Sequence, residues 1–316
     1  MKYLSLFSGM EGFGKGLEQA YENYAHEQIG QPIGQGFGGC SAFGRKSQLP
    51  SCIGFAEIER NAVAVNRFHY PDRKNYGDAS RIVCDELPDF DFLCAGFPCQ
   101  SFSVAGKRRG FDEAGGTLFF EIARILSHKR PRHFLLENVK GLLSSDDGQT
   151  YPEILRVLSR LDYRLETVVL NSKYFGVPQN RERVFFIGHS GSECSGEILS
   201  FREGDERYFK TLRTGSVIRG RNKNTSGCLD TRGVNAFDRA DLDKLIFLKN
   251  KIRRLTPVET ERLQGFPDDF SKYGINEKGQ TYELSDSARY KLCGNAVTTN
   301  VVAAIITKML ETKCLS

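Results

Sequence analysis

The sequence predicts an α/β fold in which helices cover both faces of a mostly parallel sheet. Short apolar segments of strand length alternate with helical patterns through the first 190 residues, an order that typically builds a parallel sheet. In one helical pattern Leu118, Ile122 and Ile125 recur at helical spacing, which predicts a buried helix face. The motifs described below each follow a predicted strand, and ligands in such sheets bind beyond the carboxyl ends of the strands.

The expected elements can be placed in order along the chain. The expected strands are residues 3–7, 52–56, 90–95, 133–137, 166–170 and 183–188. The expected helices are residues 14–25, 60–68, 118–127 and 151–161. Residues 26–50 are rich in Gly, Gln and Ser and are expected to form a surface insertion. From residue 190 to about residue 250 the alternation stops, and we expect a second, smaller domain there.

The pattern of cysteines and histidines indicates the cellular compartment and whether a metal is bound. The nine cysteines are scattered and contain no C-x-x-C pair, which favours reduced thiols and a cytoplasmic location. The five histidines show no metal-ligand spacing, so no metal is expected. We find no secretory leader before the first strand, and no apolar run approaches the roughly 18 residues that cross a bilayer. A membrane partner is therefore not expected.

Positive charge is concentrated in one part of the chain. The net charge is +5, yet the segment from Arg202 to Arg254 holds 14 Lys and Arg against 7 Asp and Glu. A basic segment on a nearly neutral body suits a protein that binds a phosphate backbone. A solvated basic face explains the same count, so charge alone leaves both readings open.

A glycine-containing turn, Phe7-Ser8-Gly9-Met10-Glu11-Gly12, follows the first predicted strand. Glycines there allow the backbone to approach a ligand closely. Glu57 ends the second predicted strand, where a carboxylate could accept both hydroxyls of a ribose, and Asp78 follows later, where it could accept an adenine amino group. Because the turn carries no Lys or Arg for a phosphate, the pattern favours an adenosyl ligand over a dinucleotide. Either acid alone would suit an ordinary surface position.

Cys99 follows the predicted strand 90–95, in the loop Gly96-Phe97-Pro98-Cys99-Gln100. Most cysteines are small buried apolar residues, and we expect Cys84 and Cys94 to be of that kind. A thiol beyond a strand end, in a loop stiffened by proline, can instead meet a ligand, and nearby positive charge favours its thiolate. Cys99 is therefore the candidate nucleophile.

Three further residues are candidates at neighbouring strand ends. Glu137 ends the strand 133–137 and should project over the same sheet edge as Cys99, where it can serve as a general acid. Arg181 and Arg183 would lie on the same side of an extended strand. A guanidinium there can bind a carbonyl oxygen or a phosphate, with surface salt bridging as the alternative.

Together these motifs resemble the cytosine-C5 DNA methyltransferase family, over the range from Leu4 to Val301. The most specific run is residues 97–121, with Pro98-Cys99-Gln100-Ser101-Phe102-Ser103 and Gly116-Thr117-Leu118-Phe119-Phe120-Glu121. The other matches are Glu137-Asn138-Val139, the Q-x-R-x-R pattern of Gln179, Arg181 and Arg183, Arg254-Leu255-Thr256-Pro257 with Glu259, and Gly294-Asn295-Ala296-Val297. Their order along the chain is the order of the family.

The resemblance implies a Rossmann-like methyltransferase domain of residues 1–188 and 290–316, with a target-recognition domain and hinge at 189–289. It implies S-adenosylmethionine as cofactor, S-adenosylhomocysteine as product and double-stranded DNA as substrate. The implied cofactor contacts are Phe7, Gly9, Gly12, Glu57, Ile58, Asp78, Pro98, Leu118, Asn295 and Val297. The implied catalytic residues are Cys99, Glu137 and Arg183, supported by Gln100 and Arg181. The implied DNA contacts are Ser101, Arg109, Arg219, Arg221 and Lys223.

The implied reaction explains why these residue types are needed. Cytosine C5 becomes nucleophilic when a thiolate, here Cys99, adds at C6 while an acid meets N3 and a donor meets O2. A base inside a duplex must first be rotated out of the helix. The loop 101–112, which carries Lys107, Arg108 and Arg109, would close over it as a lid.

The chain departs from the family pattern at a few positions. Ser5 stands where the family usually has Asp, Glu11 where it has Gly, and Gly115 where it has Arg. An acid beside the methionine end of the cofactor could alter its affinity or the shape of the turn. None of these changes removes a reacting group, so we expect an active enzyme.

Other functions remain open at this point. An RNA cytosine methyltransferase shares the scaffold, although the recognition region lacks the Cys-Phe-Thr tripeptide usual in that branch. A catalytically silent DNA-binding homologue would not need Cys99, Glu137 and Arg183 together. A cysteine hydrolase would need a histidine partner that the sequence does not offer. A cognate restriction endonuclease is a candidate partner in a bacterial or phage source.

Overall fold

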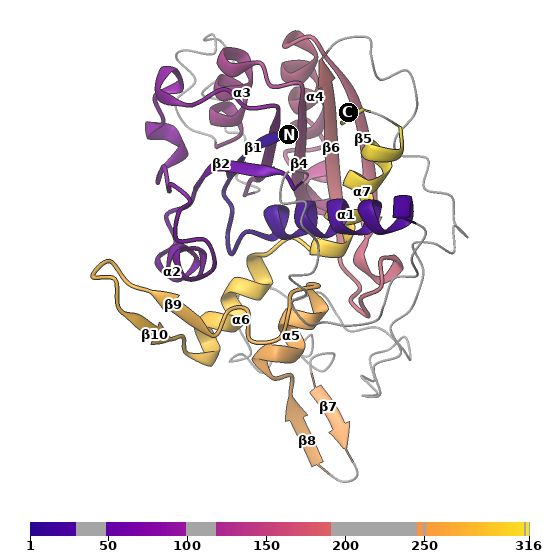
Figure 1. The fold of residues 1–316 in the computed structure, drawn as a ribbon. Coiled ribbons are helices and arrows are strands. Elements are labelled where there is room, and N and C mark those ends of the chain that lie inside the picture. The colour runs from indigo at the N-terminus through magenta and orange to yellow at the C-terminus, as the bar shows by residue number, and fades with distance from the viewer. Residues whose placement is uncertain (30–48, 99–117, 191–244, 249–250, 313, 316) are drawn as a thin grey trace.

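The computed structural model describes residues 1–29, 49–98, 118–190, 245–248, 251–312 and 314–315 (Figure 1). A six-stranded sheet forms its centre, in the spatial order β2-β1-β3-β4-β6-β5. Its strands are β1 (Lys2–Leu6), β2 (Ser51–Ala56), β3 (Phe92–Gly96), β4 (His133–Val139), β5 (Tyr163–Asn171) and β6 (Glu182–Ser190). β1 to β4 pair in parallel, and β6 runs antiparallel to both of its neighbours. The predicted α/β class and mostly parallel sheet are confirmed.

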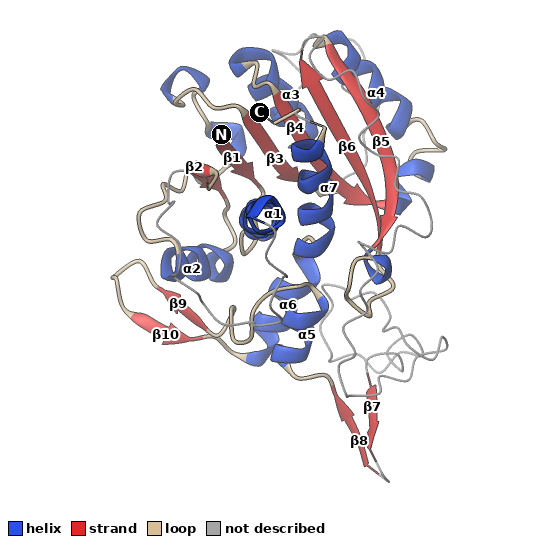
Figure 2. Cartoon of the chain, turned by 45° about the vertical axis from the view of Figure 1, so that its right-hand side comes forward, coloured by secondary structure: helices blue, strands red, loops and turns tan. Residues whose placement is uncertain are grey.

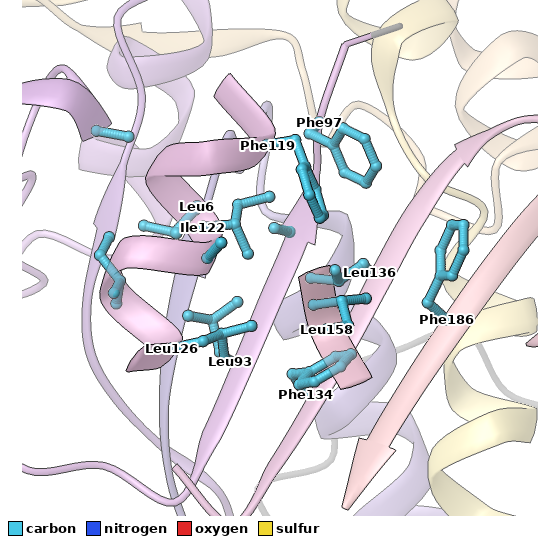
Figure 3. Close-up of a cluster of buried hydrophobic side chains, with 14 of the residues drawn as sticks. Leu6, Leu93, Phe97, Phe119, Ile122, Leu126, Phe134, Leu136, Leu158 and Phe186 are labelled. Carbon is cyan, nitrogen blue, oxygen red and sulfur yellow. The ribbon is translucent and has the colours of Figure 1, made fainter. Parts of the chain in front are cut away.

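Helices cover both faces of this sheet, as Figure 2 shows. The helices of this part are α1 (Gly12–Ile29), α2 (Arg60–His69), α3 (Leu118–Lys129) and α4 (Thr150–Arg160), with α7 (Thr299–Glu311) from the end of the chain. One buried cluster joins α3 and α4 to one face through side chains such as Ile122, Leu136 and Phe186 (Figure 3). A second joins α1 and α7 to the other face through Leu17, Phe185 and Val302. Hydrophobic burial on both faces explains why these strands are apolar nearly throughout.

The six expected strands and four expected helices are all present, with ends that differ by a few residues. Short 3-10 turns, which the sequence reading did not include, lie at Ala79–Arg81, Cys84–Glu86, Lys140–Ser144 and Ser172–Tyr174. The expected insertion begins later than residue 26, because α1 continues to Ile29. Residues 30–48 of that insertion lie outside the described residues.

The segment after residue 244 adds a third buried cluster. It contains the hairpins β7 (Leu245–Leu248) with β8 (Lys251–Arg254) and β9 (Tyr273–Ile275) with β10 (Thr281–Glu283), and the helices α5 (Pro257–Leu263) and α6 (Asp286–Asn295). Leu263 and Leu292 of this segment pack with Val65 of α2 and with Met10. Most of the expected second domain, residues 191–244, lies outside the described chain, so the domain boundaries stay predictions.

Two sequence expectations need correction here. The stretch Asp286–Glu311 is long and apolar enough to cross a membrane, contrary to our reading, but 83% of its most apolar window is buried inside the protein. It comprises two core helices, α6 and α7, with a break between them. Cys52, Cys84, Cys94 and Cys293 are free thiols, whereas Cys314 is disulfide-bonded. Reduced thiols are therefore confirmed at four positions and wrong at Cys314.

Candidate active site

The carboxyl ends of the parallel strands bring the predicted motifs to one edge of the sheet. Phe7 follows β1, Glu57 follows β2 and Phe97 follows β3. Glu137 lies two residues before the end of β4. The pairing of Gly96 with Glu137 across β3 and β4 fixes the register at this edge. Residues from four separate motifs therefore converge because parallel strands end on the same side.

The turn after β1 has the backbone shape that its glycines predict. Phe7 has a φ of 53° and Gly9 a φ of 53°, both in the left-handed region. The Phe7 amide donates to the carbonyl of Ala56 at 2.8 Å, which holds the turn against the end of β2. The backbone is therefore bent sharply here, and the Gly9 amide is directed toward the Glu57 carboxylate.

Glu57 binds the turn directly. Its Oε2 accepts the Gly9 amide at 2.8 Å, and its Oε1 accepts the amides of Ile58 and Glu59, each at 2.8 Å. Ile58 beside it is 74% exposed. A fixed carboxylate next to an uncovered apolar side chain suits a nucleoside, because a ribose needs acceptors and an adenine ring needs an apolar surface.

Asp78 contacts residues close to it in the sequence. Its Oδ1 accepts from the amide of Ser80 at 2.9 Å and from the Ser80 hydroxyl at 2.8 Å. These two bonds lower the pKa of the Asp78 carboxyl below its usual value. The side chain is 40% exposed, so an ionised acceptor stands open to solvent at this position.

The C-terminal motif closes on the first turn. A methyl group added to Gly12 would lie 2.8 Å from Val297 Cγ1 and 2.9 Å from the Val297 carbonyl, so only glycine fits there. Val297 is buried and Asn295 is exposed at the end of α6, while Leu118 is half-buried at the start of α3. The structure therefore brings Gly12 and Val297 into contact across nearly the whole sequence.

Glu137 and Arg183 form the charged pair of the site. Arg183 Nε lies 3.0 Å from Glu137 Oε1, and both side chains are largely buried, with 14% and 12% exposed. In the antiparallel register of β4 and β6, Arg183 pairs with Val139, two residues after Glu137. The side chains of Arg183 and Glu137 therefore meet on the same face of the sheet. An acid and a guanidinium at one strand end can meet adjacent polar atoms of one planar ring.

Asn138 ties this pair to the candidate nucleophile loop. Its Nδ2 donates to the carbonyl of Phe97 at 2.9 Å, and both residues are buried. Phe97 stands two residues before Cys99 in the sequence, and Pro98 between them is exposed. The chain therefore leaves β3 at Phe97 beside the Glu137 end of β4.

Arg181 has a different position from Arg183. Its guanidinium is buried, and Nη2 donates to the carbonyls of Gly294 at 3.2 Å and Ala296 at 2.9 Å. The two arginines do not share one face of a strand, because Arg181 precedes β6. Its backbone amide donates to the carbonyl of Gln179, so the chain is bent there. This geometry favours a supporting role for Arg181, which holds the motif that contains Asn295.

Several candidate residues lie outside the described residues. They are Cys99, Gln100, Ser101, Arg109, Arg219, Arg221 and Lys223. Their roles remain predictions from the sequence. Among the residues that the structure describes, no three His, Cys, Asp or Glu side chains gather as a metal site.

From the sequence we did not identify two asparagines that hydrogen-bond the backbone around Gly9 and Glu57. Asn66, fully buried in α2, donates to the Gly9 carbonyl at 2.9 Å. Asn75 accepts the amides of Glu57 at 3.2 Å and Gly77 at 2.9 Å and donates to the Glu57 carbonyl at 3.0 Å. The only sequence signal was an asparagine inside the apolar stretch of α2 and another three residues before Asp78.

Comparison with known proteins identifies the family. The family model described as C-5 cytosine-specific DNA methylase matches residues 1–219 and 205–311. The Type II methyltransferase M1.ScrFI of Lactococcus lactis subsp. cremoris is 35% identical over 309 residues, covering 87% of this chain and 76% of its own. The Type II methyltransferase M.NlaX of Neisseria lactamica is 31% identical, covering 98% and 96% respectively.

Solved structures agree in fold. The Entamoeba histolytica methyltransferase EhMeth has a TM-score of 0.63 at 15% identity, covering 98% of each chain. The S. pombe Dnmt2 methyltransferase has a TM-score of 0.60 at 18% identity, also covering 98% of each. With the matched motifs gathered at one sheet edge, the chain belongs to the C-5 cytosine-specific DNA methylase family and is a DNA cytosine methyltransferase.

Proposed function

We propose that this enzyme transfers a methyl group from S-adenosylmethionine to C5 of a cytosine that has been rotated out of duplex DNA, with Cys99 as the transient nucleophile. The observation that supports the proposal is the Glu137–Arg183 pair, at 3.0 Å, next to Asn138, which bonds the carbonyl of Phe97 two residues before Cys99 in the sequence. An acid, a guanidinium and a thiol are the three groups that activation of cytosine requires.

The residues at the other half of the edge fit the cofactor. Glu57 presents a carboxylate held by three backbone amides, and Ile58 presents an uncovered apolar side chain. When bound, S-adenosylmethionine supplies an electrophilic methyl group on a sulfonium. In this proposal Glu57 accepts the ribose hydroxyls, Ile58 and Asp78 contact the adenine, and Phe7, Gly9, Gly12, Leu118, Asn295 and Val297 enclose the rest.

Each reacting group has one task. The Cys99 thiolate forms a bond to C6 while Glu137 hydrogen-bonds N3 and Arg183 donates to O2, so that the ring's electron density moves to C5. C5 would then take the methyl group as its bond to the sulfonium sulfur breaks, which leaves S-adenosylhomocysteine. Loss of the C5 proton to solvent or a base restores the double bond and expels the Cys99 thiolate, and the product leaves with the enzyme unchanged.

The arrangement of Arg183 and Glu137 prepares this step before substrate arrives. Both groups are mostly withdrawn from water and already face each other. Preorganised charges in such surroundings stabilise developing charge more strongly than the same groups in water. A cytosine placed beside the pair would meet the Arg183 guanidinium as a donor for O2, while Glu137 donates to N3 once it carries a proton.

DNA is the proposed substrate rather than RNA. Three relatives with more than 30% identity over at least 82% of this chain are named as Type II methyltransferases, whereas another, 41% identical over 60% of the chain, is named an orphan methyltransferase. Enzymes with that name suggest a restriction-modification setting, with a cognate endonuclease as partner and a cytoplasmic location. Methylation of duplex DNA beside bulk tRNA, with tritiated cofactor, compares the two substrates directly.

The nucleophile is tested by Cys99→Ser. We expect turnover to fall by at least about 1,000-fold, because a hydroxyl is a far weaker nucleophile at neutral pH, while cofactor binding by calorimetry stays within about threefold. The matched control is Cys84→Ser, a buried thiol 15 positions earlier that lies away from the edge. Wild-type protein should also form a stable adduct with duplex DNA containing 5-fluorocytosine. Full activity in Cys99→Ser would overturn the assignment.

A further inference from the structure

A buried carboxylate lies within the proposed cofactor turn. Glu11 stands between Gly9 and Gly12, has a φ of 63° and is fully buried. A left-handed backbone is unfavourable for a residue with a side chain, and burial of a carboxylate is unfavourable as well. Two costs at one residue indicate that the side chain contributes something at this place.

The charge partner of Glu11 comes from the segment after α2. Arg73 Nη1 lies 3.7 Å from Glu11 Oε1, and the same guanidinium lies 3.2 Å from Glu18 of α1. Arg73 also lies over the ring of Tyr70, at 3.6 Å from its centroid. One arginine therefore links the turn, the first helix and the segment after α2.

The other groups around Glu11 are neutral near pH 7. Tyr3 and Ser5 of β1 turn their hydroxyls toward the carboxylate and favour its charged form, although neither carboxylate oxygen has a well-formed hydrogen bond. Cys52 of β2 and Cys94 of β3 also sense its charge. Burial raises the pKa of both thiols and of the Tyr3 phenol, so these groups stay protonated. The charges that face Glu11 are therefore those of Arg73 and Glu18.

We propose that Glu11 is a positioning residue, whose ionised carboxylate pairs with Arg73 and holds the turn Phe7–Gly12 in its cofactor-binding shape. The inference rests on the proposed function, because it assigns this turn to S-adenosylmethionine. Protonation of Glu11 removes the pairing and leaves the strained turn with less to hold it, so cofactor affinity falls when the carboxyl is neutral.

Ionisation of the buried Glu11 carboxyl is unfavourable, and this predicts a distinctive dependence of stability on pH. Burial is the main cause that raises the pKa of Glu11 to about 7, while Arg73 and Ser5 oppose the rise. The folded protein therefore becomes less stable as pH rises from about 4.5 to 7, because a buried group must ionise. Glu11→Gln should be more stable than wild type above pH 7 and bind the cofactor more weakly. If Glu11 had a purely structural role, its substitution would lower both the stability of the protein and its affinity for the cofactor.

The test measures binding and stability across pH in three full-length proteins. The variants are Glu11→Gln and its matched control Glu18→Gln, which makes the same change at the other partner of Arg73 but outside the turn. Calorimetry with S-adenosylhomocysteine gives Kd from pH 5.5 to 8.5, and thermal melts give Tm over the same range. Comparison with wild type at each pH cancels the titration of the ligand and of other residues.

We expect wild-type Kd to increase as pH falls below about 7 and to level off near the Kd of Glu11→Gln, which mimics the protonated carboxyl. Glu11→Gln should show a Kd at least about tenfold weaker at pH 8 with a flat profile, and a higher Tm than wild type there that converges with it near pH 5. The KM for S-adenosylmethionine should rise while kcat changes less than about twofold. Glu18→Gln should keep the wild-type Kd at pH 8 and a pH-dependent profile, with its inflection moved to lower pH because the Glu18 charge helps to raise the pKa of Glu11.

The proposal is overturned if Glu11→Gln keeps the wild-type Kd and pH profile, or if its Tm is lower than wild type at pH 8. Should Glu11→Gln fail to fold, Arg73→Gln provides a second test. Removal of the guanidinium takes away the partner of Glu11, so Kd at pH 8 should weaken and lose its dependence on pH, and a wild-type profile contradicts the proposal. A wild-type protein that binds no S-adenosylhomocysteine and methylates no DNA would instead reject the proposed function.

Discussion

At the scale of single residues, the site is defined by which buried charges face each other. Glu137 and Arg183 meet at 3.0 Å. A second pair lies nearby, between Lys140, just after β4, and Glu182, the first residue of β6, also at 3.0 Å. The first pair is largely buried, whereas the second is about half exposed. Exposed pairs contribute little to stability or reactivity, so the two pairs serve as site and control.

Glu137→Gln should slow the chemical step more than it weakens DNA binding. We expect kcat to fall by about 100-fold to 10,000-fold, because an amide cannot act as the acid at N3, while the Kd for duplex DNA changes less than about threefold. Single-turnover kinetics and a filter-binding titration measure the two quantities. Glu182→Gln is the control and should keep both. A loss confined to DNA binding would make Glu137 a structural residue.

A second residue-scale feature is the buried contact of His133 with His189, whose Nδ1 atoms lie 2.9 Å apart. Burial is the main cause that lowers the pKa of each ring to about 4. The unfolded rings bind protons near their ordinary pKa of about 6.5, so the unfolded state takes up more protons between pH 6.5 and 4. The free energy of unfolding should therefore fall as pH decreases through that window.

We expect each ring to lower the free energy of unfolding by about 2 kcal/mol between pH 7 and pH 5. Urea unfolding of His189→Gln at the two pH values should show roughly half of the wild-type difference from this pair. His128→Gln, at an exposed position on α3, is the control and should keep the wild-type difference. Equal pH dependence in wild type and His189→Gln would contradict the assignment.

At the scale of elements, α1 and α7 approach closely because Gly16 has no side chain. A methyl group there would lie 2.6 Å from Val302 Cβ and 2.8 Å from the Thr299 carbonyl. The two helices pack against the same face of the sheet (Figure 2), and the turn after β1 leads directly into α1. The contact thus fixes the helix that begins at the cofactor turn.

Gly16→Ala should destabilise the protein by about 1–3 kcal/mol, because the added methyl group must push the helices apart. Urea unfolding measures this effect. Gly141→Ala is the control, since a methyl group at Gly141 meets nothing within 4 Å, and it should change stability by less than about 0.5 kcal/mol. A Gly16→Ala protein as stable as wild type would show that the two helices can move apart freely.

At the scale of the whole molecule, charge is distributed unevenly along the chain. The segment from Arg202 to Arg254 holds twice as many basic as acidic residues, in a chain with a net charge of +5. A duplex bound by this segment would release counterions from its phosphates. The catalytic edge and the DNA-binding surface would then be supplied by different parts of the sequence.

Replacement of Arg219, Arg221 and Lys223 by Gln should weaken DNA binding and reduce the slope of log Kd against log salt by about 2–3. Fluorescence anisotropy at several salt concentrations measures the slope. The control replaces three exposed basic residues elsewhere, Arg81, Arg156 and Lys278, and should leave the slope nearly unchanged. Equal slopes in both triple variants would mean that the recognition region has been misplaced.

Much of the fold followed from the sequence because its signals are local. The alternation of apolar and helical segments predicted β1 to β6 and α1 to α4 within a few residues. The helices α5 and α6 were missed, since most of their residues were assigned to the recognition domain and hinge at 189–289 without any expected elements. The sequence also marked Glu57 and Glu137 as strand-end acids, which the structure places at one sheet edge.

The sequence by itself determined the alternating α/β architecture, the family motifs and the order in which they occur, because periodicity and motif spacing are properties of neighbouring residues. Only the tertiary structure decided that Arg183 faces Glu137 while Arg181, two residues earlier, reaches the carbonyls of Gly294 and Ala296. It also decided that Glu11 meets Arg73. The reason is physical: such pairings join residues 46 to 115 positions apart, and only strand register and helix packing bring them within reach.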